Sequence, residues 1–292
     1  MANLKEIRIR IDSIHSTKQI TSAMKLVAAS KLRRAQNAII KLRPYANKLR
    51  SIMQNVSQGV EENEEIMLYT EARKINKVLL IPIASNKGLC GAFNGNVIKT
   101  VIKLVENEYK EYYNSKNLEI ISIGKKVGEL LKSKKIIVTE SHEELLNNIS
   151  YEKVSELSDR VIEEYKKGSY DKVVIIYNRF KNAATQILEI EQLLPITSSE
   201  EQNSTDEIDY IYEPDKTSLL KGLIPQTLRI QIFKAVLDSF ASEQGARMTA
   251  MHKATDNAEE LIKDLKLHYN KVRQATITNE IIEIVGGAEA LK

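Results

Sequence analysis

The chain has 292 residues, a net charge of +4 from 43 basic and 39 acidic side chains, and one cysteine, Cys90. A single cysteine excludes an internal disulfide and a cysteine-rich zinc site. The sequence contains no run of about 18 apolar residues, so no membrane-spanning helix is predicted. The segment from Met1 to Arg10 begins with a helical pattern and lacks the apolar core of a signal peptide, so we expect a cytosolic chain.

Basic residues dominate the N-terminal part of the sequence. No acidic residue occurs between Asp12 and Glu61, whereas lysine and arginine recur throughout that stretch. Acidic residues return in clusters at 61–65 and 200–215. A stretch of one sign can simply be a solvated helix face, but its length here favours a surface that attracts an acidic partner.

Residues 4–56 have the period of an amphipathic helix. Leu4, Ile7, Ile11 and Ile14 recur at intervals of three and four residues. The stripe continues through Thr21, Met24, Ala28 and Leu32. Pro44 lacks a backbone donor, so we expect it to bend or interrupt the helix. The first part of the chain is therefore predicted to be a helix within residues 1–60.

The middle part, residues 61–215, changes to short β-rich runs with helical segments between them. Strands are predicted at residues 78–83, 118–123, 135–139 and 172–177, and helices at residues 96–113 and 155–167. This alternation predicts βαβ units and a Rossmann-like, mainly parallel sheet. The nearly continuous apolar runs Val78-Leu79-Leu80-Ile81 and Val173-Val174-Ile175-Ile176 indicate strands that are buried on both faces. Residues 198–209 are acidic and are predicted to form a mobile loop.

The last part, residues 216–292, is predicted to be one long helix that begins after Pro225 and ends at Gly286 and Gly287. Its apolar positions follow a sustained heptad spacing. They are Phe233, Leu237, Phe240, Met251, Ala254, Ala258, Leu261, Leu265, Val272 and Ala275. Sixty residues of helix would extend about 90 Å, which is more than a globular domain of this chain could enclose.

Three polar residues, Gln244, Arg247 and His268, occupy the same heptad positions. Such residues can fix the register of two helices, or they can mark places where the seam faces another protein. With a long helix at each end of the chain, connectivity predicts an antiparallel pair. The expected fold is therefore an α/β domain plus a long antiparallel coiled coil, in which the terminal helices form a rod.

The sequence offers no convincing active site. Residues 85–95 form a glycine-rich loop between a predicted strand and a predicted helix, but their spacing matches neither the dinucleotide fingerprint nor the P-loop. A tight turn is the favoured interpretation, with Cys90 as a packing residue. The histidines have no metal-ligand spacing. We expect no catalytic residues, no metal and no cofactor.

Several separated segments of the chain resemble the gamma subunit of F-type ATP synthases. They are residues 5–8 (KEIR), 20–31 (ITSAMKLVAASK), 43–45 (RPY), 88–91 (GLCG) with Asn94, 212–215 (YEPD), 241–248 (ASEQGARM), 254–257 (ATDN), 269–274 (YNKVRQ) and 277–280 (ITNE). The resemblance covers the whole chain in order. It departs from the family at Asn86-Lys87, where the glycine loop usually has Asp-Arg.

The resemblance implies a non-catalytic rotor shaft that couples ion-driven rotation of the c-ring to ATP synthesis or hydrolysis on the beta subunits. The implied partners are the hexameric ring of alpha and beta subunits, the epsilon subunit and the c-ring, with one copy of this chain per complex. It also implies a peripheral location on the cytoplasmic face of the bacterial cell membrane. The positions that match the family's contact and coupling segments are Met24, Lys25, Lys31, Arg247, Gln274 and Thr278.

Two other functions are compatible with parts of the sequence. A coiled coil that binds nucleic acid could use the basic N-terminal helix, but it would need residues interleaved for base contact, whereas alanines stand there. A nucleotide-dependent α/β enzyme with helical extensions would bind nucleotide tightly as the isolated chain. The resemblance favours the rotor, for which no nucleic-acid partner is expected.

Overall fold

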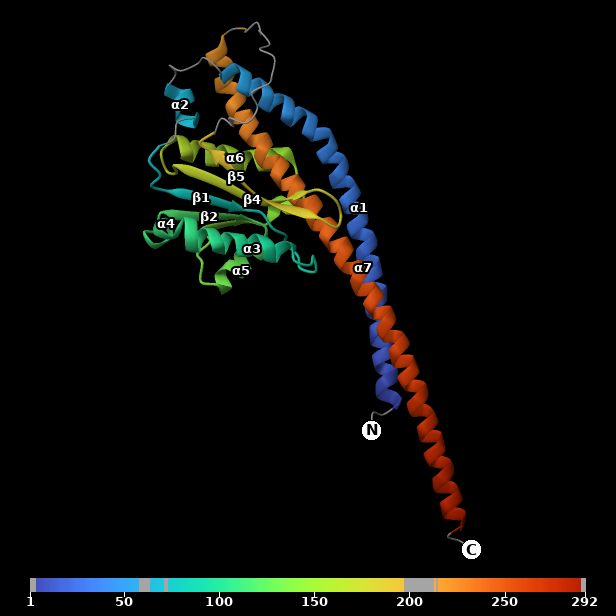
Figure 1. The fold of residues 1–292 in the computed structure, drawn as a ribbon. Coiled ribbons are helices and arrows are strands. Elements are labelled where there is room, and N and C mark those ends of the chain that lie inside the picture. The colour runs from blue at the N-terminus through green and yellow to red at the C-terminus, as the bar shows by residue number, and fades with distance from the viewer. Residues whose placement is uncertain (1–3, 58–63, 71–72, 197–212, 214, 290–292) are drawn as a thin grey trace. The chain divides into compact units, whose positions relative to one another are not determined.

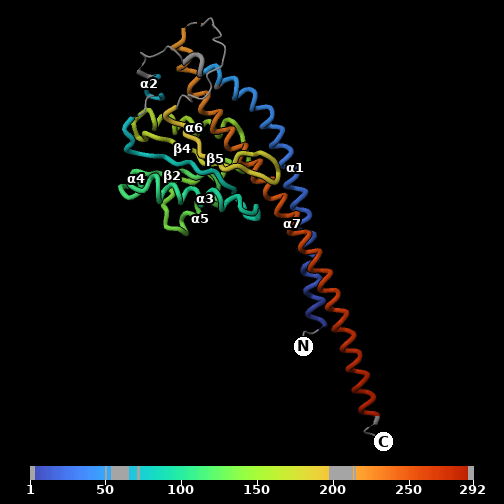
Figure 2. The backbone as a smooth tube through the Cα atoms, in the orientation of Figure 1, coloured from blue at the N-terminus to red at the C-terminus, as the bar shows by residue number. Residues whose placement is uncertain are grey.

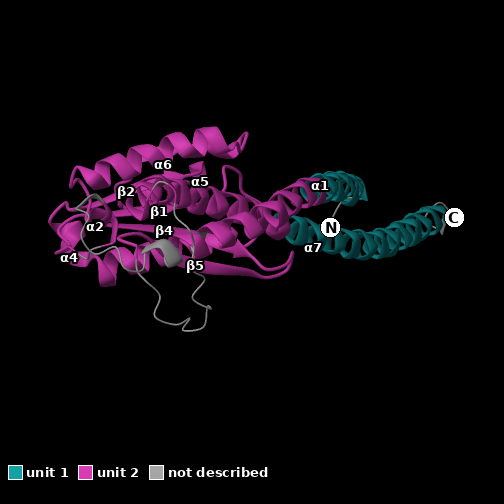
Figure 3. Ribbon diagram, turned by 90° about the horizontal axis from the view of Figure 1, so that it is seen from above, with its two compact units in different colours: residues 1–28, 247–292 teal, residues 29–246 magenta. Residues whose placement is uncertain are grey.

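The computed structural model describes residues 4–57, 64–70, 73–196, 213 and 215–289. The chain divides into two compact units, shown in Figure 3: residues 1–28 with 247–292, and residues 29–246. We call them the helical unit and the sheet unit. Two long helices, α1 (Leu4–Ser57) and α7 (Lys216–Glu289), contribute residues to both units.

The sheet unit contains every strand of the described chain. Its elements besides α1 and α7 are α2 (Glu64–Thr70), β1 (Val78–Pro82), α3 (Phe93–Lys103), the π-helical η1 (Leu104–Glu108), α4 (Lys110–Asn114), β2 (Leu118–Ile123), α5 (Lys125–Ser133), β3 (Glu140–His142), the 3-10 turn η2 (Glu144–Leu146), α6 (Tyr151–Lys166), β4 (Lys172–Phe180) and β5 (Gln186–Leu194). The expected alternation of strands and helices is confirmed.

The five strands form one sheet in the order β3-β2-β1-β4-β5. Strands β1 to β4 pair in parallel, with Val78 beside Leu118 on β2 and beside Lys172 on β4. Only β5 is antiparallel to its neighbour, β4. The Rossmann-like, mainly parallel sheet expected from the sequence is therefore present.

Two apolar cores lie on opposite faces of this sheet, because successive side chains of a strand point to opposite sides. In β1, Leu79 and Ile81 belong to one core, and Val78 and Leu80 belong to the other. Figure 1 shows α6 and the sheet unit's part of α7 on one face, and α3 and α5 on the other. Burial on both faces explains why β1 reads as an uninterrupted apolar run.

The prediction of a strand at residues 135–139 is wrong. Lys135 has a positive φ of 61°, and the amides of Lys135 and Ile136 donate to carbonyls of α5, so this segment closes the helix. The strand follows as β3, where Ile121 to Ile123 of β2 pair with Glu140 to His142. The antiparallel strand β5 was not predicted from the sequence at all.

The ends of the long helices also differ from expectation. Pro44 does not interrupt α1, so of the two expected outcomes only a bend is left, and α7 begins at Lys216, so Pro225 lies inside it. Burial of Leu220, Ile224 and Leu228 in the core around Pro225 stabilises helix on both sides of the missing donor. Gly286 and Gly287 do not end α7, which continues to Glu289. The predicted acidic loop at residues 198–209 lies outside the described residues.

Candidate functional site

In the helical unit, the N-terminal part of α1 pairs with α7 in antiparallel orientation, as the backbone trace in Figure 2 shows. The hydroxyls of Thr21 and Thr255 are hydrogen-bonded at 2.9 Å, and the Lys18 ammonium lies 3.2 Å from the Glu259 carboxylate. Lys18 lowers the pKa of Glu259 by this hydrogen bond and by its charge. The expected antiparallel pairing is confirmed.

The apolar seam between these helix segments drifts away from the predicted heptad. Met251 and Ala258 are buried as predicted, but Leu261 is 51% exposed and Ile262 is buried in its place. An α-helix advances about 3.6 residues per turn, so a strict 3.5-residue repeat moves off the seam within a few turns unless the pair supercoils. Of the polar heptad residues, Gln244 and Arg247 are buried, and His268 is exposed.

The register of the pair leaves the end of α7 without a helical partner among the residues that the structure describes. Leu4 lies 14 residues before Lys18, so in an antiparallel pair it lies opposite about Arg273, 14 residues after Glu259. Beyond Arg273, α7 continues for 16 residues to Glu289, which is about 24 Å of helix. We call residues 274–289 the overhang. The expectation that the last turns of the C-terminal helix stand alone is confirmed.

The overhang carries large apolar side chains that nothing in the described chain covers. Ile277, Ile281, Ile282, Ile284 and Val285 are 47 to 71% exposed. Apolar side chains are also exposed on the outer face of the α1 segment, at Ile9, Ile20, Leu26 and Val27. Apolar surface repeated along a helix pair in this way marks a site of contact with another protein.

The six residues singled out from the sequence are distributed along the two long helices. Met24 and Lys25 are half-buried on α1, Lys31 is exposed farther along α1, and Arg247 is buried on α7. Gln274 and Thr278 are both exposed on the overhang, where the Thr278 hydroxyl donates to the Gln274 carbonyl at 2.9 Å. The register places Met24 opposite about His252, some 22 residues or roughly 33 Å from Gln274. These positions therefore do not converge on one point.

In the sheet unit, the polar contacts that attach α7 to its surroundings include hydrogen bonds to α1, α6 and β5. Arg229 binds Asp159 of α6, Gln226 donates to the Tyr45 hydroxyl of α1, Gln231 donates to Glu191 of β5, and Asp238 accepts from Arg43 of α1. Burial, and then the nearby Glu191 carboxylate, raise the pKa of Tyr177, whose hydroxyl donates to Glu191 at 3.0 Å. Sequence reasoning missed these contacts, although Asp238 is conspicuous as an acid within an apolar stretch of the helix.

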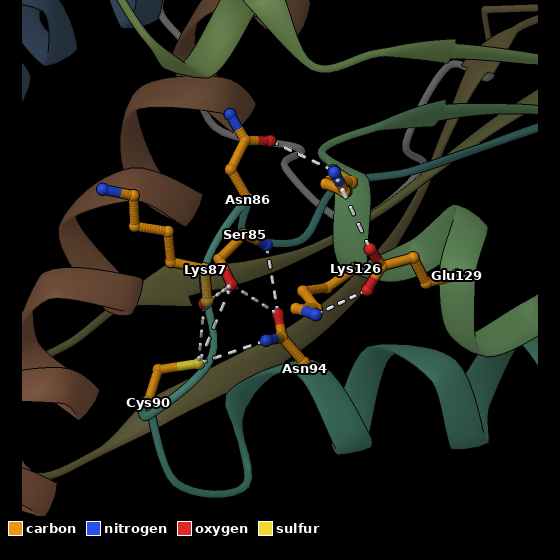
Figure 4. A network of polar contacts seen from close by, with 8 residues as sticks. Ser85, Asn86, Lys87, Cys90, Asn94, Lys126 and Glu129 are labelled. Atoms are coloured by element: carbon orange, nitrogen blue, oxygen red, sulfur yellow. Dashed lines mark hydrogen bonds and ion pairs between the residues drawn. The ribbon is translucent and has the colours of Figure 1, made fainter.

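The glycine-rich loop after β1 uses its polar side chains to hold its own turn, as Figure 4 shows. Asn94 Oδ1 accepts from the amide and the hydroxyl of Ser85, and Asn94 Nδ2 lies 3.2 Å from Cys90 Sγ. Ser85 and Cys90 are buried. The interpretation of this loop as a tight turn with Cys90 as a packing residue fits this geometry.

Asn86, at the first position where the loop departs from the family pattern, joins three segments. Its Nδ2 donates to the Glu143 carbonyl at 2.8 Å, and its Oδ1 accepts from the Lys125 amide at 3.0 Å. An aspartate could not donate to Glu143, so the amide suits this environment. Among the residues that the structure describes, no three His, Cys, Asp or Glu side chains gather in a way that could hold a metal ion.

Comparison with known proteins identifies the family. A family model described as ATP synthase matches residues 3–291. Proteins named ATP synthase gamma chain from Christiangramia forsetii and Flavobacterium johnsoniae are 51% and 52% identical over 291 residues, with 100% of this chain and 99% of each relative covered. This chain belongs to the ATP synthase gamma-chain family. The resemblance seen in its sequence is thereby confirmed.

Solved structures of mitochondrial ATP synthases contain chains with a similar fold. A chain of the Euglena gracilis mitochondrial ATP synthase has a TM-score of 0.72 at 23% identity and covers 99% of this chain and 94% of its own length. A chain of the Tetrahymena thermophila mitochondrial ATP synthase, from a structure of the central stalk and c-ring, has a TM-score of 0.59 at 24% identity. It covers 80% of this chain and 99% of its own length. At these identities the likeness concerns the fold.

Proposed function

We propose that this chain is the central rotor shaft of an F-type ATP synthase and couples rotation of a c-ring to ATP synthesis or hydrolysis on beta subunits. As a gamma chain it is a non-catalytic subunit. The exposed apolar overhang is the observation that carries the proposal, because these side chains need another protein to cover them. A ring of alpha and beta subunits around the helix pair would provide that cover. Family membership does not support the alternative of a nucleic-acid-binding coiled coil.

The proposed division of labour follows the helices. Residues 1–60 and 216–292 form the shaft, and residues 61–215 form a foot that binds the epsilon subunit and the c-ring. No helix in the described part of the chain is long and apolar enough to cross a membrane. The gamma chain belongs to the peripheral sector of the synthase, and we place it on the cytoplasmic face of the bacterial cell membrane.

We propose that Met24, Lys25, Lys31, Arg247, Gln274 and Thr278 contribute to contacts with the surrounding ring. Exposed ion pairs are worth about 1 kcal/mol or less, so contacts with lysines on α1 can break and reform as the shaft turns. Changing the nucleotide affinity of a catalytic site requires several kcal/mol in total. The shape of the shaft and many weak contacts would supply that energy together.

The experiment is to assemble the chain with its alpha, beta, epsilon and c-ring partners in vesicles and to measure ATP hydrolysis and ATP-driven ion pumping. The proposal predicts that pumping depends on this chain. Hydrolysis by the complete complex without any pumping would contradict it. Nucleotide binding is a separate criterion: tight binding by the isolated chain in calorimetry would favour the enzyme alternative.

The substitution Met24→Lys tests the contact surface. The resemblance implies an acidic loop on the beta subunits beside this segment of the shaft. A cation at this half-buried position would form a strong ionic contact with that loop and reduce the number of ions pumped per ATP. Met24→Leu is the control, since it conserves volume and adds no charge. Unchanged pumping efficiency in Met24→Lys would remove this segment from the coupling surface.

A further inference from the structure

Three elements of the sheet unit meet at one guanidinium group. Arg43 of α1 donates from Nη2 to Oδ1 of Asp238 on α7 and to the carbonyl oxygen of Phe180 at the end of β4, both at 3.3 Å. Each of the three other polar contacts of α7 described above, made by Arg229, Gln226 and Gln231, joins two elements. Arg43 therefore holds both helices and the sheet together through a single side chain.

The partner of Arg43 is a deeply buried acid. The Asp238 side chain has no exposed surface, whereas that of Arg43 is 43% exposed. Asp238 Oδ2 has no hydrogen-bond partner among the described residues, and neither has the buried Ser242 hydroxyl one turn farther along α7. Arg43, the nearby charge of Lys234 and a hydrogen bond from the Phe180 backbone favour the charged form of Asp238, so loss of Arg43 would leave this buried carboxylate less compensated.

The end of the β4–β5 hairpin is a stiff attachment point. Asn182 Oδ1 accepts from the amides of Ala184 and Thr185, which closes the turn through a side chain. Strand β4 pairs with β5 as far as Phe180, and its first five residues, Lys172 to Ile176, also pair with β1 in the centre of the sheet. A force applied at Phe180 is therefore shared by the centre of the sheet.

Close packing at Gly245 of α7 supplements the Arg43 contact. A Cβ atom at Gly245 would lie 3.2 Å from the Ala183 Cα, 3.3 Å from the Ala183 carbonyl oxygen and 3.5 Å from the Phe180 ring. A glycine inside a helix is unfavourable by about 1 kcal/mol relative to alanine. Here the glycine lets the helix backbone approach the hairpin turn directly.

We propose that Arg43, Asp238, the Phe180 carbonyl and the Gly245–Ala183 contact form the joint through which rotational force passes between the sheet and the two helices. We call this group the Arg43 joint. The proposal rests on the rotor function proposed above and adds the place where the foot is fixed to the shaft. Arg43 acts here as a positioning residue, because it holds the elements in register and has no reacting partner.

Torsional stiffness is the property that tests the joint. The chain is assembled with its alpha and beta subunits, the ring is fixed to a surface, and a bead is attached through a cysteine that replaces the 75% exposed Ile137 of the sheet unit. The native Cys90 is buried and would stay unlabelled. The angular variance of the bead, without ATP and therefore at rest, reports the compliance between the foot and the shaft held by the ring.

Arg43→Ala should increase this variance about twofold if the guanidinium and the Gly245 contact contribute independently and equally to the stiffness of the joint, because the variance is inversely proportional to that stiffness. Arg179→Ala is the matched control. Arg179 immediately precedes Phe180 and pairs with Glu189 at 2.7 Å within the hairpin, without linking the sheet to either helix. The bead variance of the Arg179→Ala complex should equal that of the complex with the otherwise unsubstituted chain. An unchanged variance in an assembled Arg43→Ala complex would overturn the proposal.

If the Arg43→Ala complex does not assemble, Arg43→Lys is used to test the joint instead. A lysine keeps the charge but loses the planar fork that reaches two acceptors, so its variance should fall between those of the native chain and a chain without the joint. In that case, a bead variance in Arg43→Lys equal to that of the native chain would overturn the proposal. Failure of the native chain to couple hydrolysis to pumping would instead contradict the rotor function, which this comparison of variances does not measure.

Discussion

Between Lys216 and Ala246, helix α7 buries one row of residues in the core of the sheet unit, whereas after Arg247 the same helix becomes progressively exposed. Leu228, Ile232 and Val236 are at most 2% exposed, but Leu267 and Ile284 are about 70% exposed. Both parts are rich in aliphatic residues. The difference teaches that this chain supplies the environment of the first part, while another protein must supply the environment of the second.

The comparison depends first on the core. Ile232→Ala should lower the free energy of unfolding of the sheet unit by about 3 kcal/mol, because it removes buried methyl groups and leaves a cavity. Ile282→Ala, at a position that is 62% exposed, should change it by less than about 0.5 kcal/mol. Denaturant unfolding of the isolated chain measures both. Equal effects of the two substitutions would contradict the distinction between the two parts of α7.

A smaller loss of stability is expected in the helical unit, where α7 pairs with α1. Thr255→Val removes the hydroxyl that bonds Thr21 and should weaken the pair by about 1 kcal/mol. Hydrogen exchange of the α1 amides around Thr21 should accelerate accordingly. Thr278→Val is the control, because the Thr278 hydroxyl bonds only within its own helix. Equal acceleration in both variants would show that the bond between the helices adds nothing.

Glycines in the two parts of α7 should respond in different ways. Gly286→Ala should stabilise the last turns by somewhat less than 1 kcal/mol, since alanine favours helix and the added Cβ would meet nothing within 4 Å. Gly245→Ala should gain less or lose stability, because its Cβ would press on the Ala183 backbone. In Gly286→Ala, the stabilisation should be measured as slower hydrogen exchange of the amides at the C-terminus of α7. A larger gain at Gly245 would reverse the comparison.

The smallest effect is expected on the pH dependence of folding stability. The stability difference between the native chain and Asp238→Asn should change little near neutral pH and more as the pH falls. Burial, which outweighs the attraction of Arg43, raises the pKa of Asp238 above its ordinary value of about 3.9. The folded state therefore binds a proton before the unfolded state does as the pH falls. Relative to Asp238→Asn, the native chain should become more stable between the raised pKa and that ordinary value. A relative loss of stability there would show that Arg43 dominates the pKa.

Strands β1, β2 and β4 could be predicted because burial on both faces produces uninterrupted apolar runs. Strand β5 could not, since Glu189, Glu191 and Gln192 interrupt its pattern. Arg179 and Tyr177 of β4 and Gln231 of α7 satisfy the two carboxylates, and these partners are defined only by the fold. Heptad spacing likewise predicted the long terminal helices, but it could not show where the seam moves from Leu261 to Ile262.

The contact positions on the shaft came from resemblance to the family, and their roles remain predictions. The Arg43 joint differs, because Arg43 and Asp238 are 195 positions apart in the chain and no local pattern connects them. An acid within the apolar stretch around Asp238 was the signal present in the sequence. That Arg43 is the cation paired with Asp238 could be recognised only from the folded structure.

The overhang also has a consequence for the chain before it joins a complex. A newly synthesised copy would present a helix end lined with isoleucines to the cell, and such surfaces promote self-association. Early capture by other subunits would shield this end from aggregation. The same residues would then link the solubility of the free chain to the order in which the machine is built.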